Sequence, residues 1–142
     1  MVQAAPSRRA QATIVTSAVF MAHAGDPFNL RPVEYTLLTL IVENPGGSLA
    51  RLARALAVTA PNITMWIDKL EARGLVRREP SPTDRRAQLL HATPEGESLA
   101  RQATQSILEA ERAALTTLSP AEHAMLVELL HKVACARSDG AA

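Results

Sequence analysis

The fold is decided by one continuous stretch of the chain, TAPNITMWIDKLEARGLVRREPSPTDRRAQLLHATPEG, which covers residues 59–96. Its first part predicts a helix that begins at Thr59, a good N-cap residue, and ends near Gly74, which can adopt the left-handed turn that closes helices. One side of this helix is apolar at helical spacing: Ile63, Ile67 and Leu70. We therefore expect this side to face the core and the opposite side to face solvent.

A β-hairpin is predicted directly after this helix. Residues 75–78 and 88–92 have the length and the apolar content of strands, and the charged, turn-rich residues 79–86 separate them. Thr93 followed by Pro94 then predicts another helix, because a capping hydroxyl and a first-turn proline commonly begin helices. The hairpin should project from the domain with its charged loop at the tip.

A short helix is expected just before the stretch, from the capping residue Ser48 to about Val58. Its predicted inward face is apolar: Leu49, Leu52, Ala53 and Leu56. Two short helices three or four residues apart give the outline of a helix-turn-helix, in which the first helix braces the second. The hairpin that follows makes this a winged helix-turn-helix.

Further helices are expected on both sides of this motif. The first runs from Ser7 and stops near Gly25-Asp26-Pro27, and the second runs from Pro32 to Glu43 with Asn29 as a candidate cap. A capping box, Ser119-Pro120-Ala121-Glu122, begins the last helix. The predicted fold class is therefore mainly α, with helices plus one β-hairpin wing.

The first and last helices carry more apolar surface than a small winged domain can cover. The last helix contributes an apolar stripe: Met125, Leu126, Leu129, Leu130 and Val133. A second copy of the chain in a two-fold dimer would bury this surface. We therefore divide the chain into an N-terminal dimerisation helix at 1–30, a winged helix-turn-helix DNA-binding lobe at 31–96 and C-terminal dimerisation helices at 97–142.

Composition limits the class of protein. The chain has 142 residues, of which 47% are apolar and 20% charged, and a formal net charge of +1, which suits a single compact domain. One cysteine makes no intramolecular disulfide, and no targeting or membrane-spanning segment is recognised, so a cytoplasmic protein with no membrane association is expected.

Charge is distributed unevenly along the chain. Residues 50–91 contain eight basic and four acidic side chains, whereas residues 92–136 contain three basic and six acidic ones. A basic middle followed by acidic helices would approach a polyanion such as double-stranded DNA from one side only.

The chain resembles the MarR (multiple antibiotic resistance regulator) family of bacterial transcription factors over nearly its whole length. The resemblance rests on the joint spacing of Asp68-Lys69-Leu70-Glu71-Ala72-Arg73-Gly74-Leu75-Val76-Arg77-Arg78, Asp84-Arg85-Arg86 and Thr93-Pro94-Glu95-Gly96. It implies a homodimer that binds a pseudo-palindromic operator, commonly as a repressor, and that a small-molecule effector releases from DNA.

The resemblance also implies which residues contact DNA. The groove-facing start of the recognition helix corresponds to Pro61, Asn62, Thr64 and Met65. Arg86 corresponds to the wing-tip residue that enters the minor groove, and Asp84 to the carboxylate that orients it; a carboxylate two residues away can hold an arginine fork by paired hydrogen bonds. The remaining cations are phosphate candidates: Arg51, Arg54, Lys69, Arg73, Arg77 and Arg85.

One expected DNA contact departs from the family pattern, and the expected effector cleft is inferred from the family resemblance alone. Met65 stands where many members have arginine or a polar residue, so an apolar contact with a thymine methyl replaces hydrogen-bonded readout there. The family's effector cleft lies between the dimerisation helices and the DNA-binding lobe. Here it would recruit Phe20, His23, Phe28 and Tyr35, with Trp66 as either a pocket wall or a core residue.

Other functions remain as alternatives. A winged helix can bind protein instead of DNA, although eight cations on the motif and the wing favour DNA. A metal- or oxidant-sensing regulator of the same fold is a second alternative, with His123, His131 and Cys135 spaced at multiples of four; only the last two could share an ion, and two ligands make a weak site. No cofactor, metal or enzymatic activity is expected, because no phosphate loop, nucleophile motif or convergent carboxylate pair is present in the sequence.

Overall fold

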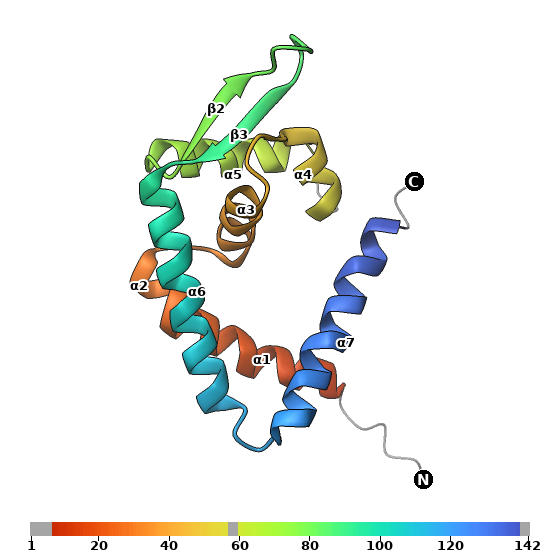
Figure 1. The fold of residues 1–142 in the computed structure, drawn as a ribbon. Coiled ribbons are helices and arrows are strands. Elements are labelled where there is room, and N and C mark those ends of the chain that lie inside the picture. Colours follow the sequence, from red (N-terminus) through yellow and green to blue (C-terminus); the bar gives the residue numbers. More distant parts are fainter. Residues whose placement is uncertain (1–6, 57–59, 140–142) are drawn as a thin grey trace.

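A computed structural model describes residues 7–56 and 60–139. Its elements in chain order are α1 (Arg8–Phe20), the π-helix η1 (Met21–Gly25), α2 (Asp26–Phe28), α3 (Pro32–Glu43), β1 (Gly47–Ser48), α4 (Leu49–Leu56), α5 (Ala60–Ala72), β2 (Val76–Pro80), β3 (Gln88–Ala92), α6 (Pro94–Ala114) and α7 (Pro120–Asp139). The helix-turn-helix pair α4 and α5 lies with the hairpin at one end of the molecule. Helix α1, the end of α6 and the start of α7 lie at the other end, and α7 runs back from there toward α4 (Figure 1). The winged helix-turn-helix fold predicted from the sequence is confirmed.

One apolar core lies beneath the helix-turn-helix and the sheet. Its largest fully buried side chains come from four elements: Leu37, Leu38 and Ile41 of α3, Ile63, Ile67 and Leu70 of α5, Val76 of β2 and Leu90 of β3. Ala100, Ala103 and Ile107 of α6 close the same core from the side. The inward face predicted for the second helix of the motif is therefore confirmed, and its opposite face is left for solvent.

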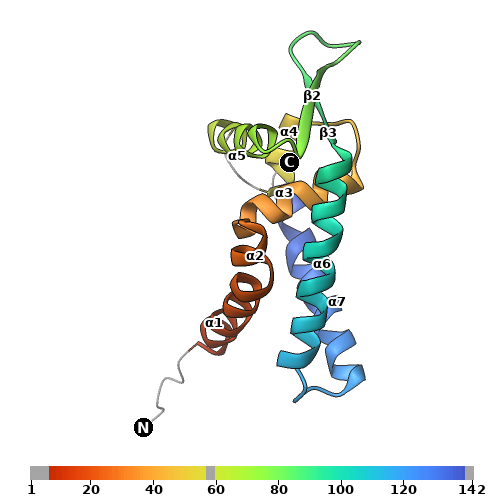
Figure 2. The ribbon, with the colours of Figure 1, turned by 90° about the vertical axis from the view of Figure 1, so that its left-hand side faces the viewer.

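The sheet has three antiparallel strands in the order β1-β3-β2. The predicted hairpin is β2 and β3, with Val76 opposite Ala92 and Pro80 opposite Gln88, and Figure 2 shows it projecting beyond α5. The third strand, β1, was not predicted, because its two residues carry no periodicity and become a strand only by pairing with Leu89 and Leu90.

Two glycines make the junction between α5, the wing and α6. Gly74 has φ +70°, the left-handed conformation predicted for it after α5. A Cβ at Gly96 would overlap the carbonyl oxygen of Leu75, so only glycine lets the first turn of α6 approach this closely. The Thr93 side chain accepts the Gly96 N–H (3.0 Å) and donates to the Gly74 carbonyl (2.6 Å), which fixes α6 against the end of α5.

The first helical segment is longer than predicted. The expected break near Gly25-Asp26-Pro27 is wrong, because the chain widens into a π turn, in which the Asp26 N–H bonds the Met21 carbonyl, and continues helically to Phe28. Asn29 ends it with φ 50° and does not cap α3. The backbone N–H of Arg31 instead bonds the Glu34 carboxylate (2.9 Å) at the start of α3.

The terminal helices differ from the core elements. Helix α1 contains no buried residue, and Ile14 is 72% exposed. The predicted capping box of α7 is present, since Ser119 and Glu122 exchange hydrogen bonds at 2.8 and 3.3 Å, but the apolar side chains that follow it are 50–68% exposed: Met125, Val127, Leu129, Leu130 and Val133. Among the described residues, no helix combines the length and the apolar character that crossing a membrane requires.

Candidate nucleic-acid interface

The recognition helix α5 is two-sided. Ile63, Ile67 and Leu70 are completely buried, which anchors the helix on the core. The predicted base-reading residues Pro61, Asn62 and Thr64 are exposed, and Met65 is 45% exposed. All four therefore lie on the accessible side of α5, whereas its expected cap, Thr59, lies outside the described residues.

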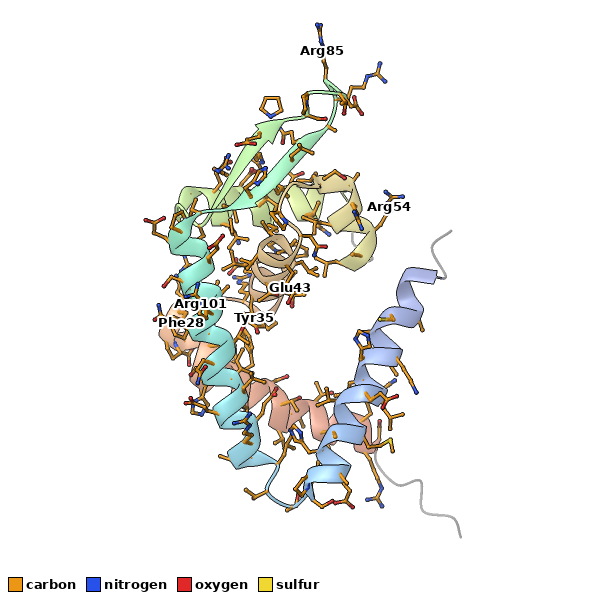
Figure 3. All side chains as sticks on the ribbon, viewed as in Figure 1. Phe28, Tyr35, Glu43, Arg54, Arg85 and Arg101 are labelled. Atoms are coloured by element: carbon orange, nitrogen blue, oxygen red, sulfur yellow. The ribbon has the colours of Figure 1, made fainter. Side chains whose placement is uncertain are left out.

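Helix α4 presents two of the predicted phosphate-binding cations. The Ser48 side chain accepts the Arg51 N–H at 3.2 Å, so the predicted cap is confirmed and the start of the helix is fixed. Leu52 and Ala53 are buried, while Arg51 and Arg54 are exposed, and Figure 3 shows Arg54 pointing outward from α4. A phosphate that reached this helix would meet both cations without displacing core residues.

The wing tip is a tight, internally bonded turn. The Ser81 N–H bonds the Ala87 carbonyl, and the Ala87 N–H bonds the Asp84 carbonyl, both at 3.0 Å. Asp84 Oδ1 accepts the backbone N–H of Arg86 at 2.9 Å. The Asp84 carboxylate was expected to bond the Arg86 guanidinium. It bonds the Arg86 backbone N–H instead, because the turn places that N–H next to the carboxylate.

Both arginines of the tip remain available. Arg85 and Arg86 are exposed, and Figure 3 shows Arg85 pointing away from the end of the hairpin. Asp84 therefore fixes the backbone at Arg86, and the exposed guanidinium extends beyond this bond.

An unpredicted ion-pair cluster joins the recognition helix to the wing. Arg78 of β2 pairs with Asp68 and with Glu71, the latter at 2.6 Å, and its side chain is only 19% exposed. The two carboxylates lie three residues apart on α5 and so share one side of the helix. Their pairing fixes α5 against β2, and the one cation offsets half of the negative charge that would otherwise repel a polyanion. The three-residue spacing of the two carboxylates was visible in the sequence, but nothing in the sequence indicated that a residue of β2 would pair with them.

Three other predicted cations have different surroundings. Lys69 is exposed on α5. Arg77 of β2 is exposed and pairs with Glu79, whose second carboxylate oxygen lies 3.2 Å from His91 Nε2. Arg73 donates hydrogen bonds to the carbonyls of Asn29 (2.7 Å) and Phe28 (2.8 Å), so its guanidinium is committed to the protein itself.

The five residues expected at an effector cleft do not gather around one cavity. Phe20 and Tyr35 pack against each other with ring centroids 5.7 Å apart, and the Tyr35 hydroxyl lies 2.8 Å from Thr104 Oγ1 of α6. Phe28 lines hollows of about 410 and 470 Å³ on another side of α6. His23 is exposed, and Trp66 is half-buried on α5 against the core.

A cavity of about 330 Å³ lies instead between α3 and α6. It is lined by Thr39, Val42, Glu43, Glu97, Ala100, Arg101, Thr104, Gln105 and Leu108. None of the five expected residues lines it, although the hydrogen bond between Tyr35 and Thr104 lies at its wall. The sequence could not have located it, because its lining combines residues of two helices with no shared motif.

The histidines and the cysteine of α7 form only a pair. His131 Nε2 and Cys135 Sγ lie 3.5 Å apart, and both side chains are exposed. Within residues 7–56 and 60–139, no three histidine, cysteine, aspartate or glutamate side chains come together as a metal site would require.

Comparisons with known proteins give a consistent identification. The sequence model of the MarR family matches residues 30–87. A Thauera aromatica protein named as a transcriptional regulatory protein for the hcr operon is 36% identical over 102 residues, which are 72% of this chain and 61% of that protein. The Pseudomonas putida HTH-type transcriptional repressor NicR is 27% identical over 117 residues, 82% of this chain and 73% of NicR.

Solved structures agree with the sequence matches. The transcriptional repressor CouR bound to a 23-mer DNA duplex has a TM-score of 0.80 and 29% identity, with 89% of each chain covered. A structure of MarR has a TM-score of 0.81 over 99% of this chain and 97% of that chain at 22% identity, which establishes a shared fold.

Proposed function

Because this chain belongs to the MarR family, whose members are transcriptional regulators and not enzymes, we propose that it acts in the cytoplasm as a homodimeric repressor. In this proposal the dimer binds a pseudo-palindromic operator in double-stranded DNA, and a small molecule releases it. The recognition helices enter two major grooves and the wings reach the flanking minor grooves.

The observation that carries the DNA-binding part is the two-sided recognition helix. Its apolar side is fully buried, while Pro61, Asn62 and Met65 are exposed on the other side. Cations flank that exposed side on α4 and on the wing: Arg51, Arg54, Arg85 and Arg86. CouR, which has this fold, is bound to a DNA duplex in its structure. The flanking cations supply salt-dependent affinity, and α5 supplies sequence choice.

The homodimer is supported by the terminal helices. Helix α1 contains no buried residue, and α7 exposes apolar side chains along most of its length. Such faces are typical of helices that pack against another subunit. A two-fold dimer that covers them would hold the two lobes at a fixed spacing, as a palindromic operator requires.

The α3–α6 cavity is the proposed effector site. Helix α6 lines the cavity and also starts directly against the end of α5, through Gly96 and Thr93. A ligand that bound one spacing of the lobes more tightly than the other would shift the population of dimers toward it. This site replaces the aromatic cleft expected from the sequence.

Competition binding tests the proposal. A fluorescently labelled duplex taken from upstream of the protein's own gene is titrated at two salt concentrations, with random DNA as competitor. Specific binding that weakens steeply with salt is expected, since several phosphates are contacted. Equal affinity for random DNA, or no binding by ligand-stripped protein, would favour the protein-binding winged helix instead.

A further inference from the structure

Arg73 connects two segments that lie far apart in the sequence. It directly follows the recognition helix α5, and its guanidinium donates to the carbonyl oxygens of Phe28 and Asn29 at 2.8 and 2.7 Å. Both acceptors belong to the end of the first helical segment, more than forty residues away along the chain. The two bonds are short and charge-assisted, the stronger class of protein hydrogen bond.

The two carbonyls that Arg73 binds lie at the end of the first helical segment, beyond its last hydrogen-bonded turn. The Asn29 N–H bonds the Asp26 carbonyl and the Leu30 N–H bonds the Gly25 carbonyl, after which the left-handed Asn29 turns the chain away. The carbonyls of Phe28 and Asn29 therefore point past the last turn. A cation is favoured at such a helix end, because the unpaired carbonyls carry partial negative charge.

The segment capped by Arg73 leads directly to the proposed dimer-forming helix. Residues 21–25 form a π turn, and Ala24 and Gly25 are buried at this joint. Helix α1 precedes the joint without interruption and keeps Ile14 and Val15 exposed. A displacement of α1 would therefore reach the end of α5 through Arg73, in addition to any route through the core.

We propose that Arg73 is a positioning residue that couples the N-terminal helical segment to the recognition helix, and that it is not a phosphate contact. This inference rests on the proposed DNA-binding function and reassigns one residue of the expected interface. Two clamps then hold α5: Arg78 ties it to the wing, and Arg73 ties it to the N-terminal segment. Dimer geometry sensed by α1 would in this way set the placement of α5.

The test compares Arg73→Met with Lys69→Met, a matched control one helical turn earlier on α5. Lys69 is exposed, and the structure records no ion pair for it within residues 7–56 and 60–139. Loss of a phosphate contact lowers affinity and reduces the slope of log affinity against log salt by about 0.9. We expect this result for Lys69→Met with the upstream duplex. Arg73→Met should lower affinity about tenfold and leave the slope unchanged, whereas a slope reduced as in the control would overturn the proposal.

Hydrogen exchange of the free protein supplies a readout that does not depend on DNA. In Arg73→Met, the amides of residues 26–31 and of 69–75 should both exchange faster than in wild type, because the coupling between them is lost. Arg73→Lys, which can donate to one of the two carbonyls, should restore part of both the protection and the affinity. Unchanged exchange in Arg73→Met would overturn the proposed coupling, whether or not the protein binds the duplex. Absence of duplex binding by the wild-type protein would instead contradict the proposed DNA-binding function.

Discussion

The DNA-binding lobe and the terminal helices differ in how far their apolar side chains are buried. The lobe surrounds its own core, with α3, α5 and β3 contributing completely buried side chains. Helices α1 and α7 leave theirs exposed, as Ile14 at 72% and Val133 at 68% illustrate. The lobe is therefore held by a core that α6 completes, whereas a second copy would cover the terminal helices in the proposed dimer. Substitutions in the two regions should consequently affect different properties.

The largest effect is expected from a charge in the apolar stripe of α7. Leu129→Glu should weaken association of two copies by about 2–4 kcal/mol, because a carboxylate would be buried in the proposed interface. Sedimentation equilibrium measures the change. Ala124→Glu adds the same charge on the opposite side of α7 and should leave the dimer intact. If both variants weakened association equally, or neither did, the apolar stripe of α7 would not be the dimer interface.

The next effect lies inside the lobe. Arg78→Met leaves Asp68 and Glu71 without their shared cation and should lower the free energy of unfolding by about 1–3 kcal/mol. Arg77→Met removes a pair whose side chains are 51% and 44% exposed, and should cost less than about 1 kcal/mol. Urea unfolding of both variants separates the clamp from the surface pair. Equal losses of unfolding free energy in the two variants would show that the Arg78 cluster stabilises the fold no more than an exposed ion pair does.

A smaller effect concerns DNA and leaves folding unchanged. Arg86→Ala should weaken binding to the upstream duplex about tenfold, or about 1.4 kcal/mol, because the wing loses its minor-groove cation. Its melting temperature and dimerisation should match wild type, since the side chain is exposed. Anisotropy titrations and thermal scans measure these quantities, and an unaltered affinity would disprove the wing-tip assignment.

The smallest effect is a pH dependence at the start of α7. Hydrogen bonds from the Ser119 backbone N–H and side chain lower the pKa of Glu122, so the ionised carboxylate stabilises the helix. This stabilisation is complete above the pKa of the unfolded chain and is lost as the pH falls through the lower pKa of the folded state. Glu122→Gln should therefore melt about 2 °C or less below wild type near neutral pH. The difference should vanish in acid, and one that grew in acid would contradict the assignment.

Sequence reasoning located the elements whose signals are local. Pro32 and Glu43 bound α3 as predicted, and the Ser119-to-Glu122 box begins α7, because caps and prolines act within one turn. The hairpin followed from its strand-length segments and its turn-rich loop.

The features that escaped prediction depend on contacts between distant segments. The two-residue strand β1 exists only through β3, and Arg73 finds its acceptors more than forty residues away. The segment through Pro27 continued as a helix because a π turn precedes it, which no residue pattern announces. For the same reason the residues expected at an effector cleft are spread over several surfaces, whereas the four α5 residues that the family resemblance implied are all exposed.

The number of protomers that one operator duplex binds tests the proposed dimeric repressor most directly. Sedimentation velocity of the labelled upstream duplex, with increasing protein, measures the mass of the saturated complex. Two protomers per duplex, with no stable complex of one, are expected if the terminal helices join the lobes before DNA is bound. Saturation at one protomer per duplex would contradict the proposed dimeric repressor.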